Sequence, residues 1–300
     1  MHVLSRPEAG FYGTHSVATD PGGDGWSTLN ALSGSPAELA AAVRNLVVHR
    51  EGCADLGFTL PQERRNEAET RYLSDILTVL KGLGEGDGGI GEAREPKARF
   101  AGTCRDFALL FAAALRHNGI PARLRCGFMT YGLPDFHGDH WVTEYWRPGK
   151  GWTLADPEFG GYDPDFDAMD VPRDRFIVAG DAWRSYREGT ADPSNFGIRI
   201  PDVLDLTGPA MLRGNVVRDL AALNKVEVLP WDCWGLAEGE TEPGDADLAL
   251  LDRVADLESA GGPFEGLRDA YLDNPALKIT SPVTSYTTYG GVRIVEIRGE

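Results

Sequence analysis

Residues 102–121, GTCRDFALLFAAALRHNGIP, carry the pattern that decides the fold class. The run 107–115 is apolar without interruption, which is typical of a helix enclosed by other elements rather than an amphipathic surface helix. Thr103 is a suitable N-cap, and Gly119 is a suitable helix stop. The sequence therefore predicts a buried helix with Cys104 in its first turn.

Cys104 would occupy a special electrostatic position at that end of the helix. The unpaired N–H groups and the positive end of the helix dipole favour thiolate over thiol. The same groups, including the N–H of Cys104 itself, can hold an oxyanion that forms beside the sulfur. The alternative is a small core cysteine, since free cysteines are often buried.

Two segments after the strand expected over 122–130 predict a hairpin. They are HWVTEYW (140–146) and GWTLADPEF (151–159). A turn centred on Pro148 or Gly149 brings His140 and Asp156 opposite or diagonal on one face, roughly 4.5 to 8 Å apart at Cβ. An imidazole and a carboxylate at that distance can hydrogen-bond, which stabilises the imidazolium. Thiol, imidazole and carboxylate together are the elements of an activated-thiol site.

These blocks, in this order over roughly residues 98–160, resemble the core of the transglutaminase-like superfamily, including its bacterial members. The resemblance implies an α+β, papain-like fold in which the cysteine helix packs on an antiparallel sheet. It also implies a Cys-His-Asp triad of Cys104, His140 and Asp156, used for acyl transfer or amide hydrolysis without a cofactor. Arg105 stands where animal transglutaminases carry tryptophan, and neither calcium activation nor protein crosslinking is carried over.

The rest of the chain is expected to fall into three parts. Residues 1–35 would be an irregular leader, residues 36–185 the catalytic core with its N-terminal helices, and residues 186–300 a C-terminal α+β extension, either in the same body or appended to it. The predicted helices outside the cysteine helix cover about 36–53, 63–80, 173–187, 211–223, 247–257 and 263–274. The last two strands are expected in LKITSP (277–282) and VRIVEIR (292–298).

The composition narrows the possible partners. The 300 residues carry a formal net charge of −17, which disfavours nucleic acid and anionic membranes and weakly favours neutral or cationic substrates. The four cysteines are scattered, which suits a reducing compartment. The N-terminus has no apolar signal-peptide core, and no run of 18 apolar residues occurs. We therefore expect a cytoplasmic protein without a membrane span.

The sequence supports three hypotheses for function. The first is a cysteine acyltransferase or amidohydrolase acting on a peptide or a small amide, ester or thioester, with an amine or water as acceptor. The second is a metal-dependent hydrolase that uses DFHGDH (135–140), in which His137 also competes with His140 as a base. The third is a non-catalytic scaffold with this fold.

Further candidate features are less specific. Substrate-lining candidates are Trp141, Trp231 and Trp234, for which packing against the core is the alternative. His49 is expected to be a surface or structural histidine. The polar segment 82–97 is interpreted as a connection or a lid before the cysteine helix.

Overall fold

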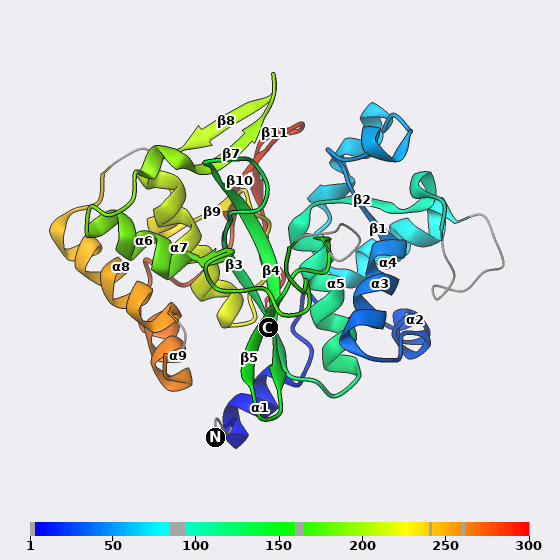
Figure 1. Cartoon of the computed structure of the whole chain (residues 1–300), viewed down its shortest axis with the longest axis horizontal. Coiled ribbons are helices and arrows are strands. Elements are labelled where there is room, and N and C mark those ends of the chain that lie inside the picture. The colour runs from blue at the N-terminus through cyan, green and yellow to red at the C-terminus, as the bar shows by residue number, and fades with distance from the viewer. Residues whose placement is uncertain (1–3, 85–93, 160–164, 240–241, 260–261, 300) are drawn as a thin grey trace. The chain divides into compact units, whose positions relative to one another are not determined.

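The computed structural model describes residues 4–84, 94–159, 165–239, 242–259 and 262–299, and its helices and sheets confirm the α+β class. The chain forms two compact units, with residues 1–124 and 142–171 in unit 1, and residues 125–141 and 172–299 in unit 2. The division falls inside two strands, β3 (Ala122–Met129) and β4 (His137–Arg147), which Figure 1 labels. Of the segment 82–97, interpreted above as a connection or a lid, residues 85–93 lie outside the described residues.

Unit 1 is mainly helical. Its other elements are α1 (Arg6–Tyr12), α2 (Gly25–Ala31), α3 (Pro36–Leu46), β1 (Val47–His49), η1 (Ala54–Leu56), η2 (Gln62–Glu69), α4 (Leu73–Leu83), η3 (Pro96–Ala98), β2 (Phe100–Gly102), α5 (Cys104–His117) and β5 (Gly151–Ala155). The helices α2 and α3 pack on α5, as the labels in Figure 1 allow the reader to follow.

The central helix of unit 1 is α5, as the sequence predicts. Its residues from Cys104 to Arg116 are all buried, and Gly119 follows its end with a φ of 74°. A left-handed residue at this position stops a helix, and glycine adopts it without strain. Thr143 Oγ1 on β4 donates to the main-chain oxygen of Ala108 at 3.0 Å, so the helix and the strand are joined by a buried hydrogen bond.

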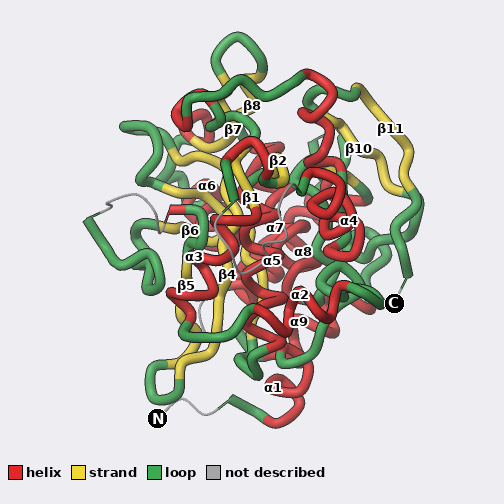
Figure 2. The backbone as a smooth tube through the Cα atoms, turned by 90° about the vertical axis from the view of Figure 1, so that its right-hand side faces the viewer, coloured by secondary structure: helices red, strands yellow, loops and turns green. Residues whose placement is uncertain are grey.

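Unit 2 contains the remaining elements. They are β6 (Phe176–Val178), α6 (Ala179–Arg187), η5 (Pro193–Asn195), β7 (Phe196–Ile200), β8 (Leu204–Thr207), α7 (Pro209–Leu223), β9 (Asp232–Cys233), η6 (Gly235–Ala237), α8 (Asp245–Glu258), α9 (Phe264–Leu272), β10 (Val283–Thr287) and β11 (Gly291–Val295). The last two strands run side by side as a hairpin (Figure 2).

The largest sheet has the strand order β6-β3-β4-β7-β8, with β5 also paired to β4. The pairs β3–β6, β4–β5 and β7–β8 are antiparallel, whereas β4–β7 is parallel over two residues. Two smaller sheets have the orders β1-β2 and β11-β10-β9. The described residues contain no helix long and apolar enough to cross a membrane.

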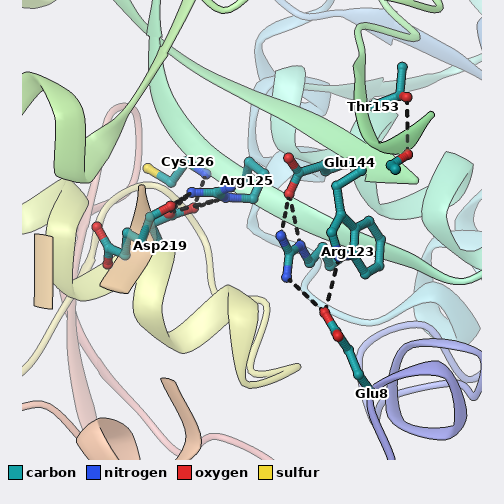
Figure 3. A network of polar contacts seen from close by, with 10 residues as sticks. Glu8, Arg123, Arg125, Cys126, Glu144, Thr153 and Asp219 are labelled. Atoms are coloured by element: carbon teal, nitrogen blue, oxygen red, sulfur yellow. Dashed lines mark hydrogen bonds and ion pairs between the residues drawn. The ribbon is translucent and has the colours of Figure 1, made fainter. Parts of the chain in front are cut away.

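Several expected elements differ from those observed. The stretch 1–35 was expected to be irregular, but it contains α1 and α2. The helix α1 is held in unit 1 because Glu8 accepts a hydrogen bond from the Trp152 indole at 3.0 Å and pairs with Arg123 (Figure 3). Its N-cap Ser5 is followed by a proline at the first turn, a start signal that the sequence does contain.

Two predicted helices are shorter than expected, for different reasons. The helix from Pro36 starts with a Ser35–Glu38 capping box but ends at Leu46, because the β-branched Val47 and Val48 pair with β2 instead. The helix predicted over 63–80 is a 3₁₀ segment followed by α4, since the polar stretch of η2 has no apolar face to bury.

In unit 2, strand pairing again shortens one predicted helix, and one predicted strand is absent from its expected position. The helix expected over 173–187 begins only at Ala179, because the preceding residues pair with β3 as β6. LKITSP is not a strand, and β10 begins at Val283, where buried and more exposed residues alternate. The helices α7, α8 and α9 lie close to their predicted positions.

Candidate active site

The backbone that leads to Cys104 is fixed by strand pairing within unit 1. β2 runs parallel to β1 with His49 opposite Gly102, and the Arg50 N–H donates to the Gly102 oxygen at 2.9 Å. Thr103 is extended, and α5 begins at Cys104, whose exposed fraction is 8%. The thiol therefore lies at the positive end of a 14-residue helix, the position that the sequence predicts.

Thr103 and Asp106 form a capping box at this helix start. The Asp106 carboxylate accepts the Thr103 N–H at 2.9 Å and the Thr103 hydroxyl at 3.4 Å. A Cβ on Gly102 would lie 2.8 Å from Asp106 Oδ2, so this position requires glycine for close approach. The cap is thus packed against the strand that delivers the chain to Cys104.

Arg105 is fully buried and neutralises Asp106. Its Nη1 lies 3.1 Å from Asp106 Oδ1, and its Nη2 donates to the main-chain oxygen of Arg71 at 2.7 Å. Burial raises the pKa of Asp106, while the Arg105 guanidinium and the Thr103 N–H act in the opposite direction. Arg105 is therefore one half of a buried ion pair beside the candidate nucleophile.

Asp156 lies just after β5, not on it as the sequence suggested. It is fully buried, and its Oδ1 accepts the N–H groups of Glu158 at 3.0 Å and Phe159 at 3.2 Å. Arg44 on α3 donates to the Pro157 oxygen at 2.9 Å and interacts electrostatically with Asp156. Asp156 is therefore held by its own turn and by a neighbouring cation.

The hairpin register agrees with the turn that the sequence indicates. Thr143 pairs with Ala155, and Arg147 pairs with Gly151. Asp156 follows Ala155, the last residue of β5 in this register, and its N–H donates to the Ala168 oxygen at 2.7 Å. His140 precedes Val142 by two residues on β4, so the two side chains project from the same face of that strand.

His140 belongs to unit 2 and is buried. Its ring makes edge contacts with Tyr131, at 6.2 Å between ring centroids, and with Phe176, at 6.3 Å. Aromatic rings on two sides restrict how the imidazole can rotate. The side chain of this candidate base is therefore confined, which is what proton transfer at a defined position requires.

The residue before His140 is anchored to α7 by a polar chain. Asn215 Nδ2 donates to Asp139 Oδ1 at 2.5 Å, and Arg218 donates to Asn215 Oδ1 at 2.8 Å. Burial raises the pKa of Asp139, and the charges of Arg218 and His140 and the bond from Asn215 oppose that rise. This chain fixes the strand segment that bears His140 within unit 2.

The three predicted catalytic residues thus fall in two units, with Cys104 and Asp156 in unit 1 and His140 in unit 2. Each is at least nine-tenths buried, and each lies on or next to a regular element.

The positions of the DFHGDH residues do not support the hypothesis of a metal-dependent hydrolase. His137, Asp139 and His140 lie on β4 rather than in the loop expected for DFHGDH. His137 stacks on Phe196 with 4.3 Å between ring centroids, and Asp139 is bonded to Asn215. Over the described ranges, no group of three or more His, Cys, Asp or Glu side chains is arranged to hold a metal ion.

The tryptophans proposed to line a substrate cleft are largely inside the protein. Trp141 is fully buried, and Trp234 is buried with its indole N–H donated to the Leu277 oxygen at 2.8 Å. Trp231 is half-buried and accepts the Tyr286 N–H through its main-chain oxygen. Trp141 and Trp234 therefore pack inside the protein, which was the alternative to a place in a substrate cleft.

A surface hollow of about 380 Å³ in unit 1 is remote from Cys104. It is lined by residues such as Pro36, Ile120, Trp146 and Met169. Ile120 follows the C-terminal end of α5, and a 14-residue helix is about 20 Å long. This hollow is therefore not the space into which the Cys104 thiol opens.

Comparison with known proteins finds a family match for part of the chain. The family model described as the transglutaminase-like superfamily matches residues 70–157. The resemblance noted in the sequence is therefore confirmed for this part of the chain. A comparison with curated proteins found no match.

Among solved structures, the chain is similar to a candidate cysteine protease from Cytophaga hutchinsonii, at 19% identity and a TM-score of 0.20. The likeness covers 56% of this chain and 53% of that one, so the chain spans about half the length of that relative. At this TM-score the likeness carries no argument about fold or function.

Four residues near the candidate site were missed by reasoning from sequence. Asp106 had a readable signal, because Thr103-x-x-Asp106 is a capping-box spacing. Arg44 and Asn215 had none, since each acts on a residue more than 70 positions away along the chain. Arg105 was noted only as a departure from the animal enzymes, and its pairing with Asp106 was not predicted.

Proposed function

We propose that this protein is a cysteine-dependent acyltransferase or amidohydrolase that uses Cys104, His140 and Asp156. The observation that carries the proposal is that the superfamily match, residues 70–157, contains all three and that Cys104 begins α5. A superfamily of cysteine enzymes is supported directly by that match. The triad and the reaction are our inference.

The proposed reaction has two halves. The Cys104 sulfur forms a bond to the carbonyl carbon of an amide, ester or thioester, while His140 holds the thiol proton. The bond to the leaving group breaks, and His140 returns the proton to it. An amine or water then attacks the thioester, His140 removes the acceptor's proton, and the thiol is regenerated. No cofactor takes part in this scheme.

Two features support the roles of His140 and Asp156. The β4–β5 register pairs Thr143 with Ala155, so Asp156 is next to a residue paired with β4, the strand that bears His140. The side chain of Asp156 is fully buried, and a buried acid stabilises an imidazolium more strongly than an exposed one. The proposed substrates are peptides or small acyl donors.

The test is acylation by p-nitrophenyl acetate, followed by mass spectrometry of the peptides. We expect one acetyl group on Cys104 and release of nitrophenolate, neither of which occurs with Cys104→Ala. His140→Ala should slow acylation by about 10²–10⁴-fold. Labelling of Cys53, Cys126 or Cys233 in place of Cys104 would contradict the assignment.

His49→Ala is the matched control for the base. His49 is the register partner of Gly102, two residues before Cys104, and its Nδ1 accepts the Glu51 N–H at 3.2 Å. We expect this variant to keep most of the acylation rate. If His49→Ala loses the rate and His140→Ala keeps it, the base is His49 and the proposed triad is wrong.

Added amines separate the two reaction types. If the acetyl group on Cys104 is removed faster in the presence of a primary amine, with formation of the acetylated amine, the enzyme is an acyltransferase. Release that does not respond to amines indicates hydrolysis.

A further inference from the structure

The two residues that follow the candidate nucleophile carry opposite charges inside the protein. Arg105 and Asp106 are each 0% exposed, and their side chains are joined at 3.1 Å. Interior charges are rare because removing them from water carries a large free-energy cost. A pair placed in the first turn of α5, directly after Cys104, therefore calls for an explanation beyond helix formation.

The hydrogen bonds around Asp106 favour its ionised form. Its Oδ2 accepts the N–H and the hydroxyl of Thr103, and its Oδ1 accepts from Arg105. Three donors directed at one carboxylate stabilise its negative charge and oppose burial, which raises the pKa of Asp106. The geometry beside Cys104 is thus that of an ion pair between an arginine cation and an aspartate anion.

Other charged or titratable groups pack near this helix start. His49 and Arg50 come from the end of β1, where Arg50 acts electrostatically on Asp106. Glu67 of η2 accepts the Ala101 N–H at 2.8 Å and is itself paired with Arg64. These groups stay unchanged in the variants below, so they form a constant background.

We propose that Arg105 and Asp106 are positioning residues that set the acidity of the Cys104 thiol. The proposal rests on Cys104 being the nucleophile proposed above. The Asp106 anion alone would oppose formation of a thiolate in the same helical turn, and it would cancel much of the effect of the helix dipole. Arg105 balances that anion, so Asp106 can cap the helix without suppressing the thiolate.

The competing explanation is purely structural. Arg105 also donates to the Arg71 oxygen, and it therefore ties the segment before α4 to α5. A structural role predicts that removal of either charge loosens the same region. The Cys104 thiol pKa would then shift in the same direction in both variants. An electrostatic role predicts opposite directions for the two charges, which makes the two explanations separable.

The experiment measures the Cys104 thiol pKa from the pH dependence of its alkylation by iodoacetamide, followed on the Cys104 peptide by mass spectrometry. We expect Arg105→Gln to raise the thiol pKa and Asp106→Asn to lower it, each by about one unit. The double variant should lie close to the unaltered protein. Arg105→Lys, which keeps the positive charge, should restore most of the normal value.

Arg116→Gln is the matched control, because Arg116 is a buried arginine at the other end of the same helix. It should leave the Cys104 thiol pKa unchanged. Shifts in the same direction for Arg105→Gln and Asp106→Asn, or no shift in Asp106→Asn with its circular dichroism intact, would overturn the proposal. If Arg105→Gln does not fold, Asp106→Asn decides alone, since a raised or unchanged Cys104 thiol pKa in that variant overturns the proposal.

The outcomes also separate this proposal from the proposed function. If the thiol pKa shifts as expected but p-nitrophenyl acetate does not acylate Cys104, the acidity proposal stands and the function is wrong. If Cys104 is acylated normally in Asp106→Asn and its thiol pKa has not moved, the function stands and the acidity proposal is wrong.

Discussion

Buried charges occur at the start of α5 and between β3 and α7, and the two groups differ in the charges that act on the buried acids. At α5, Arg105 pairs with Asp106, and Arg50 also acts electrostatically on that carboxylate. In unit 2, Arg125 binds Asp219 through two nitrogens, at 2.8 and 3.1 Å, and the carboxyl of Glu258 lies near both (Figure 3 shows Arg125 and Asp219). One group is balanced, whereas the other has an extra acid.

The difference shows in the proton affinity of the acids. Burial raises the pKa of Asp106, but its charged and hydrogen-bonding neighbours oppose that rise. Burial also raises the pKa of Glu258, and the next largest influence, the negative charge of Asp219, raises it further. The neighbouring charges therefore act in opposite directions on the two acids, since they oppose the effect of burial at Asp106 and add to it at Glu258, and only the first group lies beside the candidate nucleophile.

The largest expected effect is that of Arg125→Met. Asp219 also accepts the Cys126 N–H, so its carboxylate is committed to this interior position and would lose its cation. Breaking a buried pair by removing one partner costs about 3–5 kcal/mol of unfolding free energy. Urea denaturation measures it, and Arg199→Met, which removes an exposed pair with Asp205, should cost less than about 1 kcal/mol. Equal losses in both variants would mean that burial does not matter here.

Glu258→Gln should change the pH dependence of stability. The raised pKa means that folded Glu258 keeps its proton in a pH range where the unfolded chain has released it. The stabilisation from protonated Glu258 is therefore fully present below the pKa of Glu258 in the unfolded chain, and it is lost as pH rises through its pKa in the folded protein. Between the two pKa values, the free energy of unfolding falls by about 1.4 kcal/mol per pH unit. Glutamine does not titrate, so the variant should be the more stable protein at alkaline pH.

Denaturation of both proteins between pH 4 and pH 9 measures this effect. The free energies of unfolding should be similar at the acid end and should diverge with rising pH. A constant difference across the range would show that Glu258 is ionised in the folded state, and the contrast with Asp106 would then disappear.

Patterns within one element could be predicted from the sequence. The apolar run of α5, its cysteine at the first residue, the β4–β5 turn and the Ser35–Glu38 capping box are all local, so spacing and propensity determine them. The superfamily resemblance rests on the same local blocks, and it was confirmed for residues 70–157.

Features that depend on pairing between distant segments could not be predicted. Val47 and Val48 leave the α3 helix pattern because β2, about 50 residues later, supplies strand partners. Arg125 alternates along β3 like a solvent-facing residue, yet it is buried because α7 brings Asp219 to it. An arginine in a strand reads as exposed unless its distant carboxylate is known.

Gly102→Ala is expected to destabilise the Arg105–Asp106 pair, although Gly102 is not a member of that pair. The new methyl would lie 2.8 Å from Asp106 Oδ2 and 3.1 Å from the Phe100 ring, so the carboxylate must move away from its donors. Such crowding typically costs about 1–3 kcal/mol. The matched control is Gly52→Ala, whose methyl would meet only His49, at 3.6 Å or more, and should have little effect in the same denaturation assay. If both glycine variants are equally stable, the packing of Asp106 against β2 is looser than the distances indicate.

The smallest expected effect is that of Thr103→Ala. The hydroxyl gives Asp106 a bond of 3.4 Å, longer than the 2.9 Å bond from the Thr103 N–H, which alanine retains. Loss of an N-cap side chain costs about 1 kcal/mol, and Thr103→Ser should recover most of it. Because Arg105 and the main-chain N–H still stabilise the negative charge of Asp106, stability should fall without a change in the Cys104 thiol pKa. A shift of that pKa in Thr103→Ala, absent in Thr103→Ser, would show that the hydroxyl takes part in the charge balance at the helix start. Thr103, Arg105 and Asp106 would then all contribute to the acidity of the Cys104 thiol.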